Sequence, residues 1–101
     1  MTTGFQSPAV GYEDNGLDLN RLLVKHPFAT VFMWIDSSKY RNMGIYNGDL
    51  LVIDRAKEIL PNSLVVYAQD GEFHLGRFYS IASEAVVTGA VINVIHKVKD
   101  S

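Results

Sequence analysis

The sequence predicts a mostly β domain with one short helix, built around a curved sheet that closes on itself. Short apolar runs separated by turn-forming residues recur over most of the 101 residues, which is typical of strands joined by tight turns. The dipeptide Asp70-Gly71 lies between two such runs and is a strong hairpin signal, because glycine accepts a positive φ. Only one short stretch, near residue 20, has the apolar spacing of a helix.

The chain divides into an extended N-terminal arm, residues 1–16, and a single β domain, residues 17–101. Proline and glycine residues interrupt any regular pattern in the arm. Phe5 and Tyr12 are candidate anchors in a partner-binding arm. They would equally suit packing against the chain's own sheet, and the residues leave both interpretations open.

The helix is expected over residues 19–25. Asp18 is a suitable N-cap, because its carboxylate accepts a hydrogen bond from an amide in the first turn. Leu19, Leu22 and Leu23 share one face of this helix. Pro27 ends it, because the residue before a proline is pushed toward extended geometry.

The first expected strand, residues 28–35, is apolar on both faces and is therefore predicted to be buried. Phe32 and Trp34 on this strand would suit a docking patch, but core or sheet-face positions of a buried strand are the favoured interpretation. A turn or short helical turn follows over residues 39–46, and Tyr46-Asn47-Gly48-Asp49 is a further turn signal. The remaining expected strands, the last with a bend or bulge at Gly89, are residues 50–53, 64–68, 72–78 and 86–98.

Composition excludes several classes of function. The net charge of −2 argues against direct binding of nucleic acid, which normally needs a basic face. The chain has no cysteine, so it forms neither disulfides nor a thiolate metal site. No apolar run approaches the roughly 20 residues of a membrane helix, and no signal peptide opens the chain. We expect a cytoplasmic protein with no membrane association and no cofactor.

The histidines and two of the aspartates have structural interpretations. His26, His74 and His96 lack the spacing of metal ligands and are expected to be satisfied or exposed. Asp49 and Asp54 flank an apolar strand and resemble paired carboxylates, but turn and strand-end roles are favoured.

Five blocks of the sequence follow one another in the order of a known family: Gly4–Ala9, Asp18–Pro27, Gly48–Asp54, Asp70–Phe73 and Gly89–Ile95. Each block alone is weak evidence, but together they span nearly the whole chain. In these blocks the chain resembles the LexA/UmuD-like serine peptidases of the S24 family. The resemblance implies a curved β domain of the LexA and signal-peptidase type.

The resemblance also implies that the catalytic dyad of the family is missing. The family places its nucleophilic serine nine residues before the glycine of Gly-Asp-Leu-Leu, where this chain has Lys39. The family's lysine base corresponds to Gly76. A pseudo-peptidase is therefore expected, since acyl transfer needs a nucleophile and a base. Ser38 would replace the serine only with a one-residue insertion, and Arg77 stays protonated and is no base.

Two further departures from the family are expected. The removable arm and its Cys-Gly cleavage bond are absent, because only Met1-Thr2-Thr3 precedes the point where the processed form, UmuD′, would begin. The segment between Phe78 and Glu84 is shorter than in the family, so one strand or hairpin is expected to be trimmed.

The function implied by the resemblance is that of a non-catalytic accessory protein in error-prone DNA synthesis during the SOS response. It would act as a homodimer or as a heterodimer with a UmuD- or LexA-like relative, and it would bind a UmuC-like Y-family polymerase and the RecA filament. A regulator that pairs with an active relative and a residual peptidase using Ser38 are the alternatives. The candidate dimer interface is Phe73, Ile92, Val94, Ile95 and His96.

Overall fold

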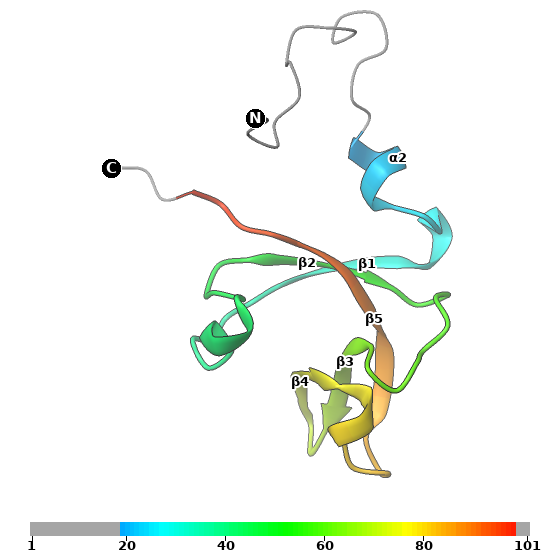
Figure 1. Cartoon of the computed structure of the whole chain (residues 1–101), viewed down its shortest axis with the longest axis vertical. Helices are drawn as coiled ribbons and strands as arrows, with labels where there is room; N and C mark the ends of the chain where they lie inside the picture. Colours follow the sequence, from blue (N-terminus) through cyan, green and yellow to red (C-terminus); the bar gives the residue numbers. More distant parts are fainter. Residues whose placement is uncertain (1–18, 99–101) are drawn as a thin grey trace, which may run out of the picture.

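The computed structural model describes residues 19–98 as a five-stranded antiparallel sheet with little helix, as predicted (Figure 1). The expected arm, with Phe5 and Tyr12, and the expected N-cap Asp18 lie outside the described residues. Helix α2 and the 3-10 helix η1 precede the first strand, and the 3-10 helices η2 and η3 lie in connections between strands. In chain order the elements are α2 Leu19–Leu23, η1 Pro27–Ala29, β1 Thr30–Trp34, η2 Arg41–Met43, β2 Leu50–Asp54, β3 Leu64–Gln69, β4 Glu72–Arg77, η3 Phe78–Ser80 and β5 Val86–Ile95.

Strand β5 joins the two halves of the sheet, whose strand order is β1-β2-β5-β3-β4. Its C-terminal half pairs with β2, from Ala90 opposite Asp54 to Ile95 opposite Leu50. Its N-terminal half pairs with β3, and this pairing ends at Ala90 opposite Val65. The register shifts once against each partner, so the long strand coils as it passes from one half to the other. Figure 1 shows β5 running from the β1–β2 pair to the β3–β4 hairpin.

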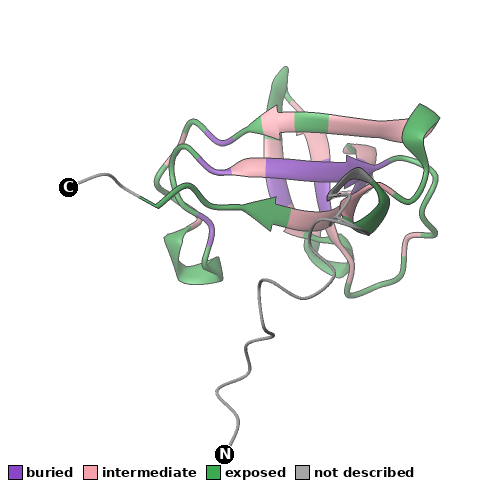
Figure 2. Ribbon diagram, turned by 90° about the horizontal axis from the view of Figure 1, so that it is seen from above, coloured by how far each residue is buried: buried purple, intermediate pink, exposed green. Residues whose placement is uncertain are grey.

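The core lies where the two halves of the coiled sheet face each other. Leu51 and Ile53 of β2 meet Val66 of β3 and Leu75 of β4, and all four are buried. Figure 2 shows the buried stretch concentrated on one central strand, because β2 is paired on both sides and covered on both faces. Within residues 19–98, no helix is both long and apolar enough to cross a bilayer.

The hairpin between β3 and β4 forms at the predicted dipeptide. Asp70 and Gly71 both have positive φ, 54° and 80°, and Gln69 pairs directly with Glu72. Two consecutive residues of positive φ define the type I′ turn, whose twist matches that of the flanking strands.

The prediction that the first strand is buried is wrong. Strand β1 is an edge strand that pairs only with β2. Val31 and Met33 pack against the core, whereas Phe32 and Trp34 on the other face are 52% and 71% exposed. The core interpretation of these two aromatic residues is therefore also wrong, because no described element covers them.

Several helices and strands also end at residues other than those predicted. Helix α2 ends at Leu23, two residues earlier than expected, and Leu22 on it is half exposed. Strand β4 ends at Arg77, because Phe78 begins the 3-10 helix η3. Strand β5 ends at Ile95 and not at Val98.

Gly89 serves as a point of close approach between β5 and the end of β2. The register shifts fall near it on both sides, which agrees with the expected bend, but the glycine itself is paired with Val66. A Cβ on Gly89 would lie 2.9 Å from the carbonyl oxygen of Asp54 and 2.9 Å from Cγ2 of Ile53. Contacts this short force the backbone apart, so only glycine fits here.

Gly89→Ala is therefore expected to lower the free energy of unfolding by about 1–3 kcal/mol, the usual cost of inserting a methyl group into a packed site. Urea unfolding followed by circular dichroism measures this change. Ala85→Gly, at a half-buried position before β5, is the matched control and should cost less than about 1 kcal/mol. Equal effects of the two substitutions would contradict the close-approach role.

Candidate functional site

The loop between β1 and β2 contains Ser38 and Lys39, the two residues considered above for the position of a catalytic nucleophile. Two hydrogen bonds close its base: the amide of Ile35 donates to the carbonyl of Asp49, and the amide of Gly48 donates to the carbonyl of Ile35, both at 2.8 Å. Gly44 ends η2 with a left-handed φ of 78°. Lys39 and Ser38 lie on the part of the loop that precedes η2, and both are exposed.

Neighbouring residues of this loop line two different clefts. Ser37, Lys39 and Tyr40 line a cleft of about 420 Å³ that is bounded on the other side by β4. Ser38 lines a second, more open cleft of about 820 Å³ near the end of β5. The loop therefore separates the two clefts, and Ser38 does not share the cleft of Lys39.

The first cleft combines an apolar floor with a polar rim. Leu51, Val66 and Leu75 form the floor, and Lys39 Nζ lies 5.6 Å from the centre of the Tyr40 ring. The Tyr40 hydroxyl accepts a hydrogen bond from the amide of Leu75 at 3.1 Å. This amide points away from β3, so the outer edge of β4 faces the cleft. Such an edge is suited to an extended peptide.

Gly76 lies next to this cleft, on β4 opposite Val65. A Cβ built there would lie 3.3 Å from the Tyr67 ring and 3.7 Å from Cγ2 of Ile81. The position is half-buried, and a longer side chain would first have to move the tyrosine. The two residues expected from the sequence at the dyad positions, Lys39 and Gly76, are thus a loop lysine in the cleft and a glycine beside a tyrosine ring.

The second cleft is polar and contains a histidine held by a buried carboxylate. His96 Nδ1 donates to Asp49 Oδ1 at 2.6 Å, and Asp49 is only 1% exposed. The Tyr46 ring packs at a tilt against the His96 ring, with 5.5 Å between their centres. A base therefore does lie in the cleft of Ser38, although within residues 19–98 no hydrogen bond joins Ser38 to it.

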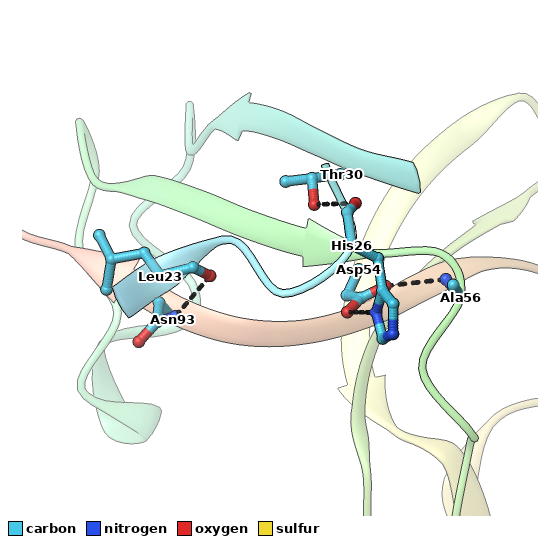
Figure 3. A network of polar contacts seen from close by, with 6 residues as sticks. All are labelled: Leu23, His26, Thr30, Asp54, Ala56 and Asn93. Atoms are coloured by element: carbon cyan, nitrogen blue, oxygen red, sulfur yellow. Dashed lines mark hydrogen bonds and ion pairs between the residues drawn. The ribbon is translucent and has the colours of Figure 1, made fainter. Parts of the chain in front are cut away.

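A second histidine, His26, is held by a second buried aspartate, Asp54, at the other end of β2. His26 Nδ1 donates to Asp54 Oδ2 at 2.6 Å, and the amide of Ala56 donates to Asp54 Oδ1 at 2.8 Å (Figure 3). Asn93 Nδ2 donates to the carbonyl of Leu23 at 3.4 Å, so residues 23–26 are held across the outer face of β2 and β5. Asp54, like Asp49, is 1% exposed.

Burial alone raises the pKa of both aspartates, because it disfavours the charged carboxylate. The hydrogen bonds outweigh this effect and hold both pKa values below the ordinary 3.8. For Asp49 these bonds come from the Tyr46 amide and His96. For Asp54 they come from His26 and the amides of Ala56 and Lys57. Both carboxylates are therefore ionised in the folded protein near neutral pH.

Sequence reasoning placed both aspartates at strand ends but missed their histidine partners. The available signal was that Asp49 and Asp54 flank a run of four apolar residues, 50–53. A central position of that strand in the sheet would bury both carboxylates, and each would then need a hydrogen-bond partner. His74, in contrast, packs against the Tyr67 ring. Within residues 19–98, no three histidine, aspartate or glutamate side chains gather as metal ligands.

The residues of the candidate dimer interface do not form one cluster in the single chain. Phe73 lies on β4 at the first cleft and is 60% exposed. His96 lies in the second cleft, directly after Val94 and Ile95 of β5, which are 37% and 40% exposed. The dimer interface stays a prediction.

Acid is expected to weaken the fold through Asp49 and Asp54. Because folding lowers their pKa values, the unfolded chain binds more protons than the folded chain near pH 4. The contribution of the two carboxylates to the free energy of unfolding is complete above their ordinary pKa of 3.8. It is lost as the pH falls through their lower pKa values in the folded protein. Urea unfolding from pH 7 to pH 3 should show this decline. Asp54→Asn should lower the free energy of unfolding at pH 7 by about 1–3 kcal/mol and flatten the decline.

Asp36→Asn, which removes an exposed loop carboxylate, is the matched control and should leave the pH profile unchanged. If the free energy of unfolding of Asp54→Asn fell with pH as steeply as that of the unmodified protein, the His26–Asp54 pair would not be a source of the acid sensitivity.

Comparison with known proteins identifies the family. The model of the Peptidase S24-like family matches residues 1–88. SamA of Salmonella typhimurium is 38% identical over 74 residues, which are 73% of this chain and 53% of SamA. MucA of Escherichia coli is 39% identical over 77 residues, which are 76% of this chain and 53% of MucA. The matched part thus spans about half the length of these two relatives.

ImpA of Shigella flexneri is 32% identical over 115 aligned positions, which cover 96% of this chain and 79% of ImpA. This alignment is longer than the chain itself, so ImpA has residues that this chain lacks. The match to the family model, the identity to these relatives and the β architecture all agree with the resemblance seen in the sequence. The chain belongs to the Peptidase S24-like family, as a UmuD-like member.

Proposed function

We propose that this protein is a non-catalytic, UmuD′-like accessory protein of error-prone DNA synthesis past lesions during the SOS response. The observation that carries the proposal is the content of the first cleft. It has an apolar floor and the outer edge of β4, both suited to an extended peptide, but its lining has Lys39 at the expected nucleophile position. Gly76, at the expected base position, lies next to the cleft and has no side chain to reach it. We expect such a cleft to bind a peptide without cleaving it.

The chemistry supports this interpretation. Peptide-bond cleavage by the family mechanism needs a hydroxyl nucleophile and a neutral lysine that takes its proton. The amine of Lys39 stands where that hydroxyl would be, and Gly76 supplies no base. Ser38 is directed to the other cleft, so no small movement of its side chain replaces the nucleophile.

A dimer is the proposed working form, either with a second copy or with a UmuD- or LexA-like relative. The C-terminal half of β5 supports this proposal. Beyond Ala90 the strand pairs with β2 but no longer with β3, and Val94 and Ile95 there are partly exposed. An edge of this kind favours pairing with another chain. The dimer would then bind a UmuC-like Y-family polymerase and the RecA filament in the cytoplasm.

We expect no peptidase activity. The protein should not react with a fluorophosphonate, which labels activated serines, and should not cleave a peptide library followed by mass spectrometry. A family member that keeps the serine and the lysine is the positive control. A specific product or label that disappears in Ser38→Ala would contradict the proposal and would indicate that His96 and Asp49 activate Ser38 in the second cleft.

Association with a polymerase is the direct test of the accessory role. Tagged protein is purified from its native host after DNA damage, with undamaged cells and the tag alone as controls, and bound proteins are identified by mass spectrometry. Recovery of a Y-family polymerase is the expected result. Recovery of an intact LexA- or UmuD-like relative without polymerase would instead favour the regulator that pairs with its own relatives. Recovery of neither would contradict the accessory role.

A further inference from the structure

The second cleft has a positive lining that neither the family chemistry nor the proposed function uses. It is formed where three segments meet: η2, the turn before β2 and the residues after β5. The pairing of Leu50 with Ile95 brings the last two together, and the closed base of the β1–β2 loop holds η2 beside them. The lining side chains are Ser38, Arg41, Tyr46, Asn47, His96 and Lys97, with Val98 at one end.

The lining of this cleft has two positive side chains and no negative one. Arg41 and Lys97 both line it, and none of its lining residues is acidic. Within residues 19–98 neither Arg41 nor Lys97 forms an ion pair. This is a local concentration of positive charge on a chain whose net charge is −2. Asp49, the nearest buried carboxylate, already accepts hydrogen bonds from His96 and from the Tyr46 amide.

The neutral lining residues are also suited to an anion. His96 uses Nδ1 for Asp49, so Nε2 is the nitrogen left for the cleft. Ser38 and Tyr46 supply hydroxyls, and Asn47 supplies an amide. Tyr46 packs against the imidazole and fixes its orientation. The cleft volume of about 820 Å³ is large enough for several side chains of a bound segment.

We propose that this cleft binds an acidic segment of a protein partner, with carboxylates pairing to Arg41 and Lys97. The planar guanidinium of arginine matches a carboxylate through two parallel hydrogen bonds. Nucleic acid is the less suitable occupant, because a phosphate backbone needs a continuous basic stripe and this chain is acidic overall. The inference does not depend on the absence of catalysis or on a polymerase partner.

The test is fluorescence anisotropy of the full chain with a fluorescein-labelled hexaglutamate peptide at low salt. We expect saturable binding that Arg41→Gln/Lys97→Gln weakens by about tenfold or more. The matched control is Arg55→Gln/Lys57→Gln, which removes two exposed cations at the opposite end of β2 and should change the affinity less than about twofold. Circular dichroism confirms that both variants fold.

Three results would overturn the proposal. The first is no binding of the peptide at millimolar concentration. The second is equal weakening by both double substitutions, which would indicate diffuse attraction to surface cations. The third is tighter binding of a 12-nucleotide oligothymidine that depends on Arg41 and Lys97, which would assign the cleft to nucleic acid. Chemical-shift changes in the unmodified protein, expected at Tyr46, Asn47 and His96 on adding the peptide, test the same site without substitution.

Discussion

The architecture depends on the shared strand β5, because each half of the sheet is paired to it. The β1–β2 pair uses its C-terminal half and the β3–β4 hairpin uses its N-terminal half. The two halves can face each other across the core only if β5 coils between them, and Gly89 permits this by letting the backbone of β5 approach that of Asp54. The buried position of β2 and the placement of both clefts follow from this arrangement.

The sequence predicted those parts of the fold that local chemistry decides. The Asp70-Gly71 turn requires positive φ at both positions, so its place in the chain fixes the register of β3 and β4. The exposure of Phe32 and Trp34 was not predictable in this way, because it depends on β1 being an edge strand without a cover. The same is true of the His26–Asp54 pair, whose members are 28 residues apart and meet only in the folded sheet.

The geometry of the candidate site was not predictable from the sequence. The resemblance predicts that Lys39 stands at the nucleophile position, with the neighbouring Ser38 as an alternative nucleophile. Only the fold reveals that the loop divides two clefts, with the lysine in one and the serine in the other. Ser38 lies at a bend and Lys39 in the turn that follows it, and no pattern in the sequence reports the direction of a side chain at such positions.

The two histidine–aspartate pairs also attach the segments that flank the sheet to one strand. His26 joins the segment after α2 to one end of β2, and His96 joins the segment after β5 to the other end. Both carboxylates belong to or adjoin the same central strand, along which the sheet is paired on both sides. Strand β2 is thus the common anchor of the segment that precedes the sheet and the segment that follows it, although these two segments are about 70 residues apart in the chain.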